Sequence, residues 1–207
     1  PLIILGASLA MSIAIFAMIP YDGAKYGGGS QAPIWYFFAL GIMSLSYTFP
    51  FSQALSVTRR EFFVGTMTAA AVTATILGVT FVAGGALERA TNGWGVNGYF
   101  FYLDWVWQAG WVVAGLFFAV LSLLLFVTGF WGATVYRRFG SLGLTVTLVG
   151  LGAILLALIW AVQQLDAWGR VFTWIGTLGA GGLAAGMAVL TVVLAGVAWF
   201  TLRRATP

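Results

Sequence analysis

Apolar residues run along this chain in long uninterrupted stretches that are separated by short polar or glycine-rich breaks. A helix needs about 20 apolar residues to cross a hydrocarbon core of roughly 30 Å. Six stretches fit this requirement, and their continuous rather than alternating pattern favours helices over barrel strands. The predicted spans are residues 2–20, 33–49, 62–86, 106–135, 141–162 and 172–202. We therefore predict an all-α polytopic membrane protein with a single transmembrane domain over residues 1–207.

The composition agrees with a membrane location. Hydrophobic residues make up 61% of the 207 positions, charged residues make up 7%, and the mean hydropathy is +1.01. A soluble domain carries about 25% charged residues, so this chain has too few to cover a surface that faces water. The chain begins at Pro1 rather than at Met, and we expect its true N-terminus to lie upstream.

The basic residues predict the orientation of the spans. Pairs of arginines follow the second, fourth and sixth spans, at positions 59–60, 137–138 and 203–204. Single basic residues, Lys25, Arg89 and Arg170, occupy the alternate loops. Because basic residues concentrate in cytoplasmic loops, we predict six spans with both ends cytoplasmic. The positive charge lies at membrane edges rather than in one patch, so we expect no nucleic-acid partner.

The residues needed for most catalytic chemistry are missing from the sequence. The chain has no Cys and no His, which removes thiol and imidazole chemistry, and we expect no metal site. No acid or base lies near the middle of a predicted span, which disfavours ion-coupled carriers. We also expect no buried carboxylate that could act as a base, and so no catalytic residues and no enzyme. The single Lys25 precedes Tyr26, so no phosphate-binding loop is present and any active transport must draw on another chain.

Aromatic residues cluster in the loop before the fourth span, between positions 94 and 107. Such a cluster is typical of the aromatic belt at a membrane interface. The alternative is a short re-entrant or interfacial segment at Tyr99–Gln108 that caps an outward gate.

The turn between the second and third spans, residues 50–61, carries the most informative motif. Pro50 is expected to end or kink the second span, because proline cannot donate the helical hydrogen bond. Thr58 and Glu61 have the spacing of a capping box, which predicts that the third helix begins at Arg59. Residues 51–57 are too many for a bare turn and too few to span, so we predict a short helix or extended turn at the cytoplasmic surface. An ordinary loop with a stop-transfer arginine pair is the alternative.

This turn resembles the corresponding turn in permease subunits of bacterial ATP-binding cassette (ABC) transporters of the type-2 exporter superfamily. The resemblance rests on the run FPFSQALSVTRREFFVGT, with its aromatic–Pro–aromatic opening, arginine pair and Gly-Thr. That family also has six spans with both ends inside. The resemblance implies a location in the bacterial plasma membrane, among membrane lipids, and a second permease copy or homologue as partner. It also implies separate cytoplasmic ABC ATPase subunits that bind ATP and Mg, with no cofactor in this chain.

In that family the turn is a coupling helix that docks on an ATPase subunit. The resemblance implies that the docking segment is Ser52–Val57 and that the coupling residues are Phe51, Ser52, Gln53, Leu55, Arg59, Arg60 and Glu61. It also implies that the second span lines a substrate cavity, with Phe38, Met43, Ser44 and Tyr47 as candidates. Helix packing is the alternative role for each of these four side chains. Larger relatives have a long re-entrant hairpin between spans five and six, where this chain has only the nine residues Gln163–Val171.

Together these features predict the transmembrane subunit of an ATP-driven ABC exporter. Since no charged group is expected at depth, the predicted substrate is hydrophobic or amphipathic, either drug-like or lipid-like. The competing interpretation is a non-transporting membrane scaffold or accessory subunit of a larger complex, which explains the absence of charge equally well.

Overall fold

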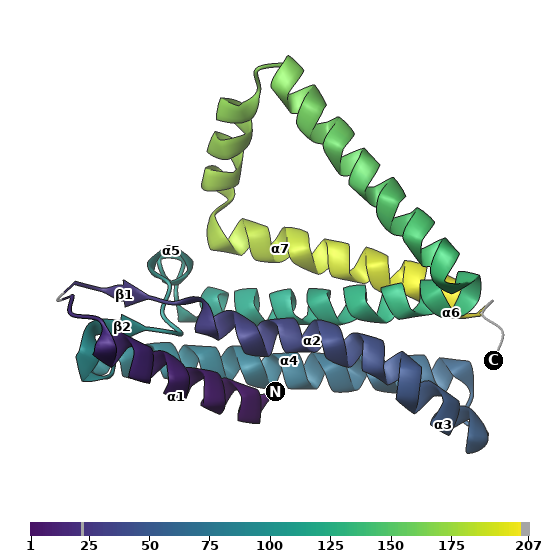
Figure 1. Cartoon of the computed structure of the whole chain (residues 1–207), viewed down its shortest axis with the longest axis horizontal. Coiled ribbons are helices and arrows are strands. Elements are labelled where there is room, and N and C mark those ends of the chain that lie inside the picture. The colour runs from purple at the N-terminus through teal and green to yellow at the C-terminus, as the bar shows by residue number, and fades with distance from the viewer. Residues whose placement is uncertain (22, 204–207) are drawn as a thin grey trace.

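The computed structural model describes residues 1–21 and 23–203, which form a helical bundle with an arm at one side (Figure 1). Asp22 and residues 204–207, which include Arg204 of the third arginine pair, lie outside the described residues. The elements in chain order are α1 (Leu2–Met18), β1 (Lys25–Tyr26), η1 (Gly28–Ser30), α2 (Gln31–Met43), η2 (Ser44–Thr48), α3 (Phe49–Ala54), α4 (Arg59–Ala90), η3 (Gly93–Asn97), β2 (Gly98–Tyr99), α5 (Asp104–Trp107), α6 (Trp111–Gln164) and α7 (Trp168–Arg203).

Four of the helical stretches in the described residues are long and apolar enough to cross a membrane. They are Gly28–Ala54, Arg59–Ala90, Trp111–Gln164 and Trp168–Arg203. The first helix, α1, is apolar but shorter, with 17 residues. The chain is therefore an all-α protein of the membrane-embedded type.

Two bends at glycine change the pattern of predicted spans. The fourth and fifth predicted spans are two helical parts of α6 that meet at a kink at Gly140 (φ 71°, ψ −171°), inside the predicted break, with no separate loop between them. The sixth predicted span contains an unpredicted bend at Gly179 in α7 (φ 58°, ψ −171°). A Cβ atom would strain this backbone conformation, so glycine is the residue that permits both bends.

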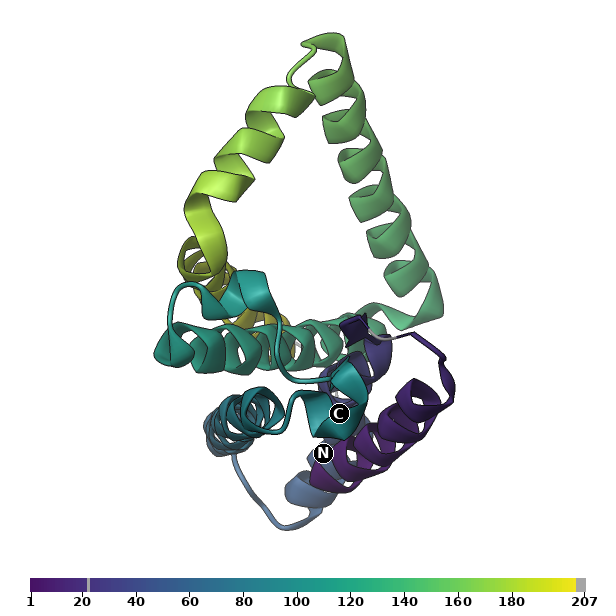
Figure 2. The same cartoon turned by 90° about the vertical axis from the view of Figure 1, so that its left-hand side faces the viewer.

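The two bends direct residues 141–178 away from the bundle, and we call this segment the arm. In Figures 1 and 2 the second part of α6 and the first part of α7 form two sides of a triangle. Every residue from 148 to 160 is exposed, including Leu155 (60%) and Trp160 (64%). The apolar surface of this middle part of the arm is thus exposed in the single chain.

The core of the bundle lies where α2 and α4 each pack against the first part of α6. At the crossing of α2 and α6, a Cβ on Gly41 would overlap the carbonyl oxygen of Phe126, and one on Gly129 would overlap that of Phe38. At the crossing of α4 and α6, a Cβ on Gly78 would lie only 2.5 Å from the carbonyl oxygen of Gly115. Small residues thus let these backbones approach closely, as is common between membrane helices.

Candidate functional site

The turn between α2 and α4 is a compact structure at the end of the bundle opposite β1 and β2 (Figure 1). The helix does not end at Pro50 but continues as α3 to Ala54, followed by Ser56 with a positive φ of 60°. Ser52 is buried, and its Oγ donates a hydrogen bond to the carbonyl oxygen of Phe49 at 2.7 Å. Gln53 Nε2 donates to the carbonyl oxygen of Val57 at 3.0 Å. Ser52 and Gln53 therefore hold the shape of the turn.

The predicted capping box is confirmed. Thr58 Oγ1 accepts a hydrogen bond from the Glu61 amide at 3.2 Å, and Glu61 Oε2 accepts one from the Thr58 amide at 2.9 Å. As predicted, α4 begins at Arg59. Glu61 is consequently engaged in starting the helix.

Two apolar side chains of the turn are exposed. Phe51 is 66% exposed and Leu55 is 62% exposed, although each is large and apolar. We call these two residues the docking patch. They are the members of the predicted coupling set whose apolar surface is available to another protein.

The structure places the two arginines of the set against α7. Arg59 Nη1 donates to the carbonyl oxygen of Arg203 at 3.1 Å, which satisfies an acceptor at the end of that helix. Arg60 lines a groove together with Trp199 of α7. The predicted coupling residues thus divide into turn-shaping residues, α7-facing arginines and the exposed docking patch.

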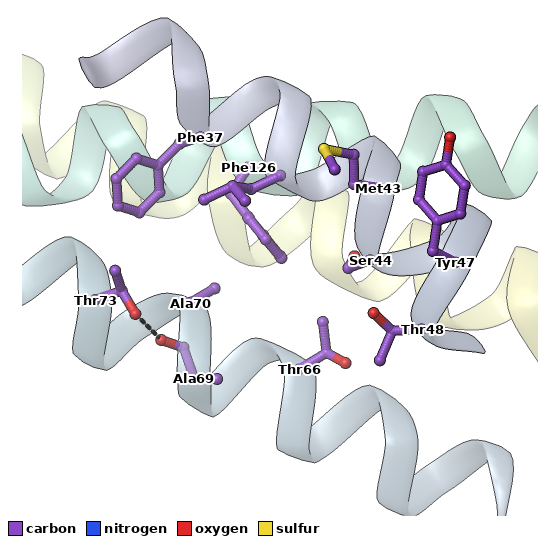
Figure 3. A pocket seen from close by; sticks show the side chains of 11 residues that line it. Phe37, Met43, Ser44, Tyr47, Thr48, Thr66, Ala69, Ala70, Thr73 and Phe126 are labelled. Atoms are coloured by element: carbon purple, nitrogen blue, oxygen red, sulfur yellow. Dashed lines mark hydrogen bonds between the residues drawn. The ribbon is translucent and has the colours of Figure 1, made fainter. Parts of the chain in front are cut away.

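A pocket of about 390 Å³ opens between α4 and the continuous helix formed by α2 and η2 (Figure 3). Its lining residues are Phe37, Leu40, Met43, Ser44, Tyr47, Thr48, Thr66, Ala69, Ala70, Thr73 and Phe126. The structure brings three of the predicted cavity residues to this pocket. Phe38 lies instead in a second pocket of about 340 Å³ between α2 and α6.

The pocket is mainly apolar, with a few hydroxyl groups. Ser44 Oγ donates to the carbonyl oxygen of Gly41 at 2.8 Å, and Thr73 Oγ1 donates to that of Ala69 at 2.7 Å. Their hydroxyl protons are thus used within their own helices, while their oxygen lone pairs can still accept hydrogen bonds. Figure 3 shows Ser44 and Thr48 directed toward Thr66, whereas the ring of Tyr47 points away from α4. No charged side chain is among the described residues that line the pocket.

The wall of this pocket includes a π-helix at η2, from Ser44 to Thr48. Pro50 has no amide proton, so it cannot donate to the carbonyl of Ser46, four residues earlier. Arg137 of α6 supplies a donor instead, with Nη2 at 3.0 Å from the Ser46 carbonyl oxygen. π-helical turns are rare and occur frequently at functional sites. Arg137 therefore links the second arginine pair to the segment between the pocket and α3.

At the opposite end of the bundle lies a buried carboxylate, so the expectation that the chain has none is wrong. Glu88 is 0% exposed. Its Oε1 accepts hydrogen bonds from Trp94 Nε1 at 2.8 Å and the Phe100 amide at 2.9 Å. Its Oε2 accepts from the amides of Phe101 and Tyr102, each at 2.8 Å. All four donors belong to the loop that follows α4. The spacing of apolar residues does not predict that this loop folds back onto Glu88.

That loop, residues 93–107, folds as a cap over the end of the bundle. Phe100 and Phe101 are each only 2% exposed, so they belong to the interior and not to an aromatic belt. Gly98–Tyr99 of β2 pairs in parallel with Lys25–Tyr26 of β1. Lys25 Nζ in turn donates to the carbonyl oxygens of residues 16 and 19 at the end of α1, each at 2.9 Å. The cap thus ties α1 and α4 together.

Comparison with family models, with curated proteins and with solved structures found no match to this chain.

Proposed function

We propose that this chain is the transmembrane subunit of an ATP-driven ABC exporter in a bacterial plasma membrane, with six spans and both ends cytoplasmic. It pairs with a second permease copy or homologue and with two cytoplasmic ATPase subunits, which bind ATP and Mg. The observation that carries the proposal is the docking patch. Exposed Phe51 and Leu55 stand on a short, internally bonded turn at the basic end of the bundle.

The continuity of the helix supports a mechanism for coupling. Residues 28–54 form one helical stretch that joins the pocket wall to α3. Closure of the ATPase subunits displaces the docking patch, and the π-helix at Ser44–Thr48 transmits that displacement to the pocket. An uncharged pocket with a few hydroxyl acceptors suits a hydrophobic or amphipathic substrate.

The test is the double substitution Phe51→Ser plus Leu55→Ser in the full chain expressed in its native cells. Truncation of apolar anchors at an interface typically costs more than about 1 kcal/mol each, so we expect at least about a tenfold loss of ATPase subunits that co-purify in mild detergent. Quantitative mass spectrometry measures this ratio. The matched control is Met18→Ser plus Ile19→Ser, which removes exposed apolar side chains (81% and 42%) at the end of α1. Full retention of ATPase by the docking-patch variant, or no ATPase with the unaltered chain, would overturn the proposal.

The exposed arm favours a second candidate, a non-transporting scaffold within a larger membrane complex. Residues 148–160 offer apolar surface on every side, which a neighbouring membrane protein could cover. The same purification separates the two functions. Recovery with other membrane proteins and no ATPase supports the scaffold, whereas a stoichiometric ATPase supports the exporter.

A further inference from the structure

A groove of about 320 Å³ runs between the beginning of α4 and the end of α7. Its lining residues are Arg60, Phe63, Val64, Ala195, Gly196 and Trp199. The rings of Phe63 and Trp199 lie 5.1 Å apart between their centroids and form an aromatic wall. A Cβ atom on Gly196 would meet no atom within 4 Å, so the groove is open at this lining position. The groove is therefore mainly apolar, with Arg60 as its basic lining residue.

Two guanidinium groups give this end of the groove a positive charge. Arg60 is exposed and makes no hydrogen bond or ion pair with any residue that the structure describes. Arg203 lies over the ring of Trp199, with its Cζ atom 5.8 Å from the ring centroid. Arg59, by contrast, is occupied by the carbonyl oxygen at the end of α7. Arg60 and Arg203 thus remain available to a negatively charged ligand.

We propose that this groove binds an anionic phospholipid, with the phosphate between Arg60 and Arg203 and an acyl chain along Phe63, Val64 and Gly196. Guanidinium groups form strong hydrogen bonds with phosphate oxygens. Tryptophan is enriched at the headgroup level of membranes, and Trp199 lines this groove beneath Arg203. Basic pockets between membrane helices are known sites for anionic headgroups. The inference requires only that the basic end of the bundle meets a membrane surface, so it is independent of the exporter proposal.

The first test measures lipid binding to the purified full chain by native mass spectrometry. The probes are phosphatidylglycerol and phosphatidylcholine with identical short acyl chains. A basic residue near the surface contributes about 1 kcal/mol to the binding of anionic lipid, so Arg60→Gln should weaken phosphatidylglycerol about fivefold. Binding of phosphatidylcholine should stay unchanged. The control Arg138→Gln removes the same charge from a residue that does not line the groove and should leave both lipids unaffected.

The second test fills the groove while keeping both arginines. Gly196→Leu inserts a side chain into the open space and should weaken phosphatidylglycerol by at least about fivefold. Gly186→Leu, at another open position of α7, is the matched control and should bind as the unaltered chain does. Both variants are compared only as monodisperse protein with unchanged helical circular dichroism, so that loss of folding is not scored as loss of binding.

Three results would overturn the inference. The first is equal affinity of the unaltered chain for the two lipids. The second is unchanged phosphatidylglycerol binding in the folded Arg60→Gln or Gly196→Leu variant. The third is displacement of phosphatidylglycerol by inorganic phosphate at equal concentration. This result would mean that the site binds a free anion and that the acyl chain does not contribute to binding.

Discussion

The side chain of Glu88 holds the cap, residues 93–107, against the end of α4. The carboxylate is completely buried, and each of its oxygens accepts two hydrogen bonds from nitrogen donors between positions 94 and 102. Burial of a charge is costly unless hydrogen bonds satisfy it, and those to a charged acceptor are stronger than those between neutral groups. The position of the cap on α4 therefore depends on this one charge.

The substitution Glu88→Gln should destabilise the fold strongly. The introduced side-chain amide would direct an NH₂ group toward donors that need an acceptor, which leaves buried N–H groups unpaired. We expect a loss on the order of 3 kcal/mol in the free energy of unfolding, measured by denaturation in detergent. The control Asp104→Asn also removes one negative charge from the cap, but Asp104 is exposed and its loss should cost less than about 1 kcal/mol. Equal stability of the two variants would contradict this role of Glu88.

The contrast between Thr58 and Glu88 indicates how far the sequence predicts individual residues. The capping box was predictable because Thr58 and Glu61 are three residues apart and the motif defines both hydrogen bonds. The burial of Glu88 was not, because three of its donors are backbone amides 12 to 14 positions later in a loop without periodicity. Likewise, the sequence predicted that Arg59 and Arg60 lie at the start of α4. It did not predict that α7 lies beside them, as the structure shows.

Among the elements, α2 and α6 show most clearly how glycine sets the distance between helices. Gly41 meets the backbone of α6 at Phe126, and Gly129 of α6 meets the backbone of α2 at Phe38. The two contacts are reciprocal, so the crossing has no room for a methyl group on either side.

Gly41→Ala should therefore force α2 away from α6 and lower the free energy of unfolding by about 1–3 kcal/mol, as overpacking usually does. Gly65→Ala is the matched control, because this helical position in α4 has no neighbouring atom within 4 Å. The control should be neutral or stabilising by up to about 1 kcal/mol, since alanine favours a helix more than glycine does. Thermal denaturation in detergent measures both. A Gly41→Ala protein as stable as the control would disprove the close crossing.

The boundaries of the elements were predictable where polar residues interrupt an apolar run, and less so where glycine does. The start of α4 follows a polar turn and was predicted correctly. The bend at Gly179 lies in a run of small and apolar residues whose composition looks the same whether the helix is straight or bent. The break after the fourth predicted span was located correctly at 136–140, because the kink lies at Gly140. Residues 136–139 are helical, which the polarity of Arg137 and Arg138 does not predict.

In the molecule as a whole, Gly140 determines how the arm leaves the bundle. Its φ of 71° with ψ of −171° belongs to a region that residues with a Cβ almost never occupy. Figure 1 shows the second part of α6 turning back above the first part. Gly140 thus sets the direction in which the arm leaves the bundle, and Gly179 sets the direction in which it returns.

Gly140→Ala should straighten α6 and move the arm outward. The chain has no cysteine, so spin labels can be attached at Leu116→Cys and Leu155→Cys, both at exposed positions (55% and 60%). A straight helix would separate these labels by about 58 Å, so electron–electron double resonance should report a shift to longer distances. The control Gly150→Ala, at an open helical position of the arm, should leave the distance unchanged. An unchanged distance in the Gly140→Ala protein would mean that this bend does not depend on glycine.

The pairing of β1 with β2 also constrains how the chain enters the membrane during synthesis. Lys25 aligns with Gly98, although two of the long apolar helical stretches separate them in sequence. The pair can form only after the ribosome has delivered both helices and only if both loops have reached the same compartment. A chain in which one of these helices inserted backwards would leave the two strands on opposite sides of the bilayer. The strand pairing is therefore compatible only with a topology in which both loops lie on the same side of the bilayer.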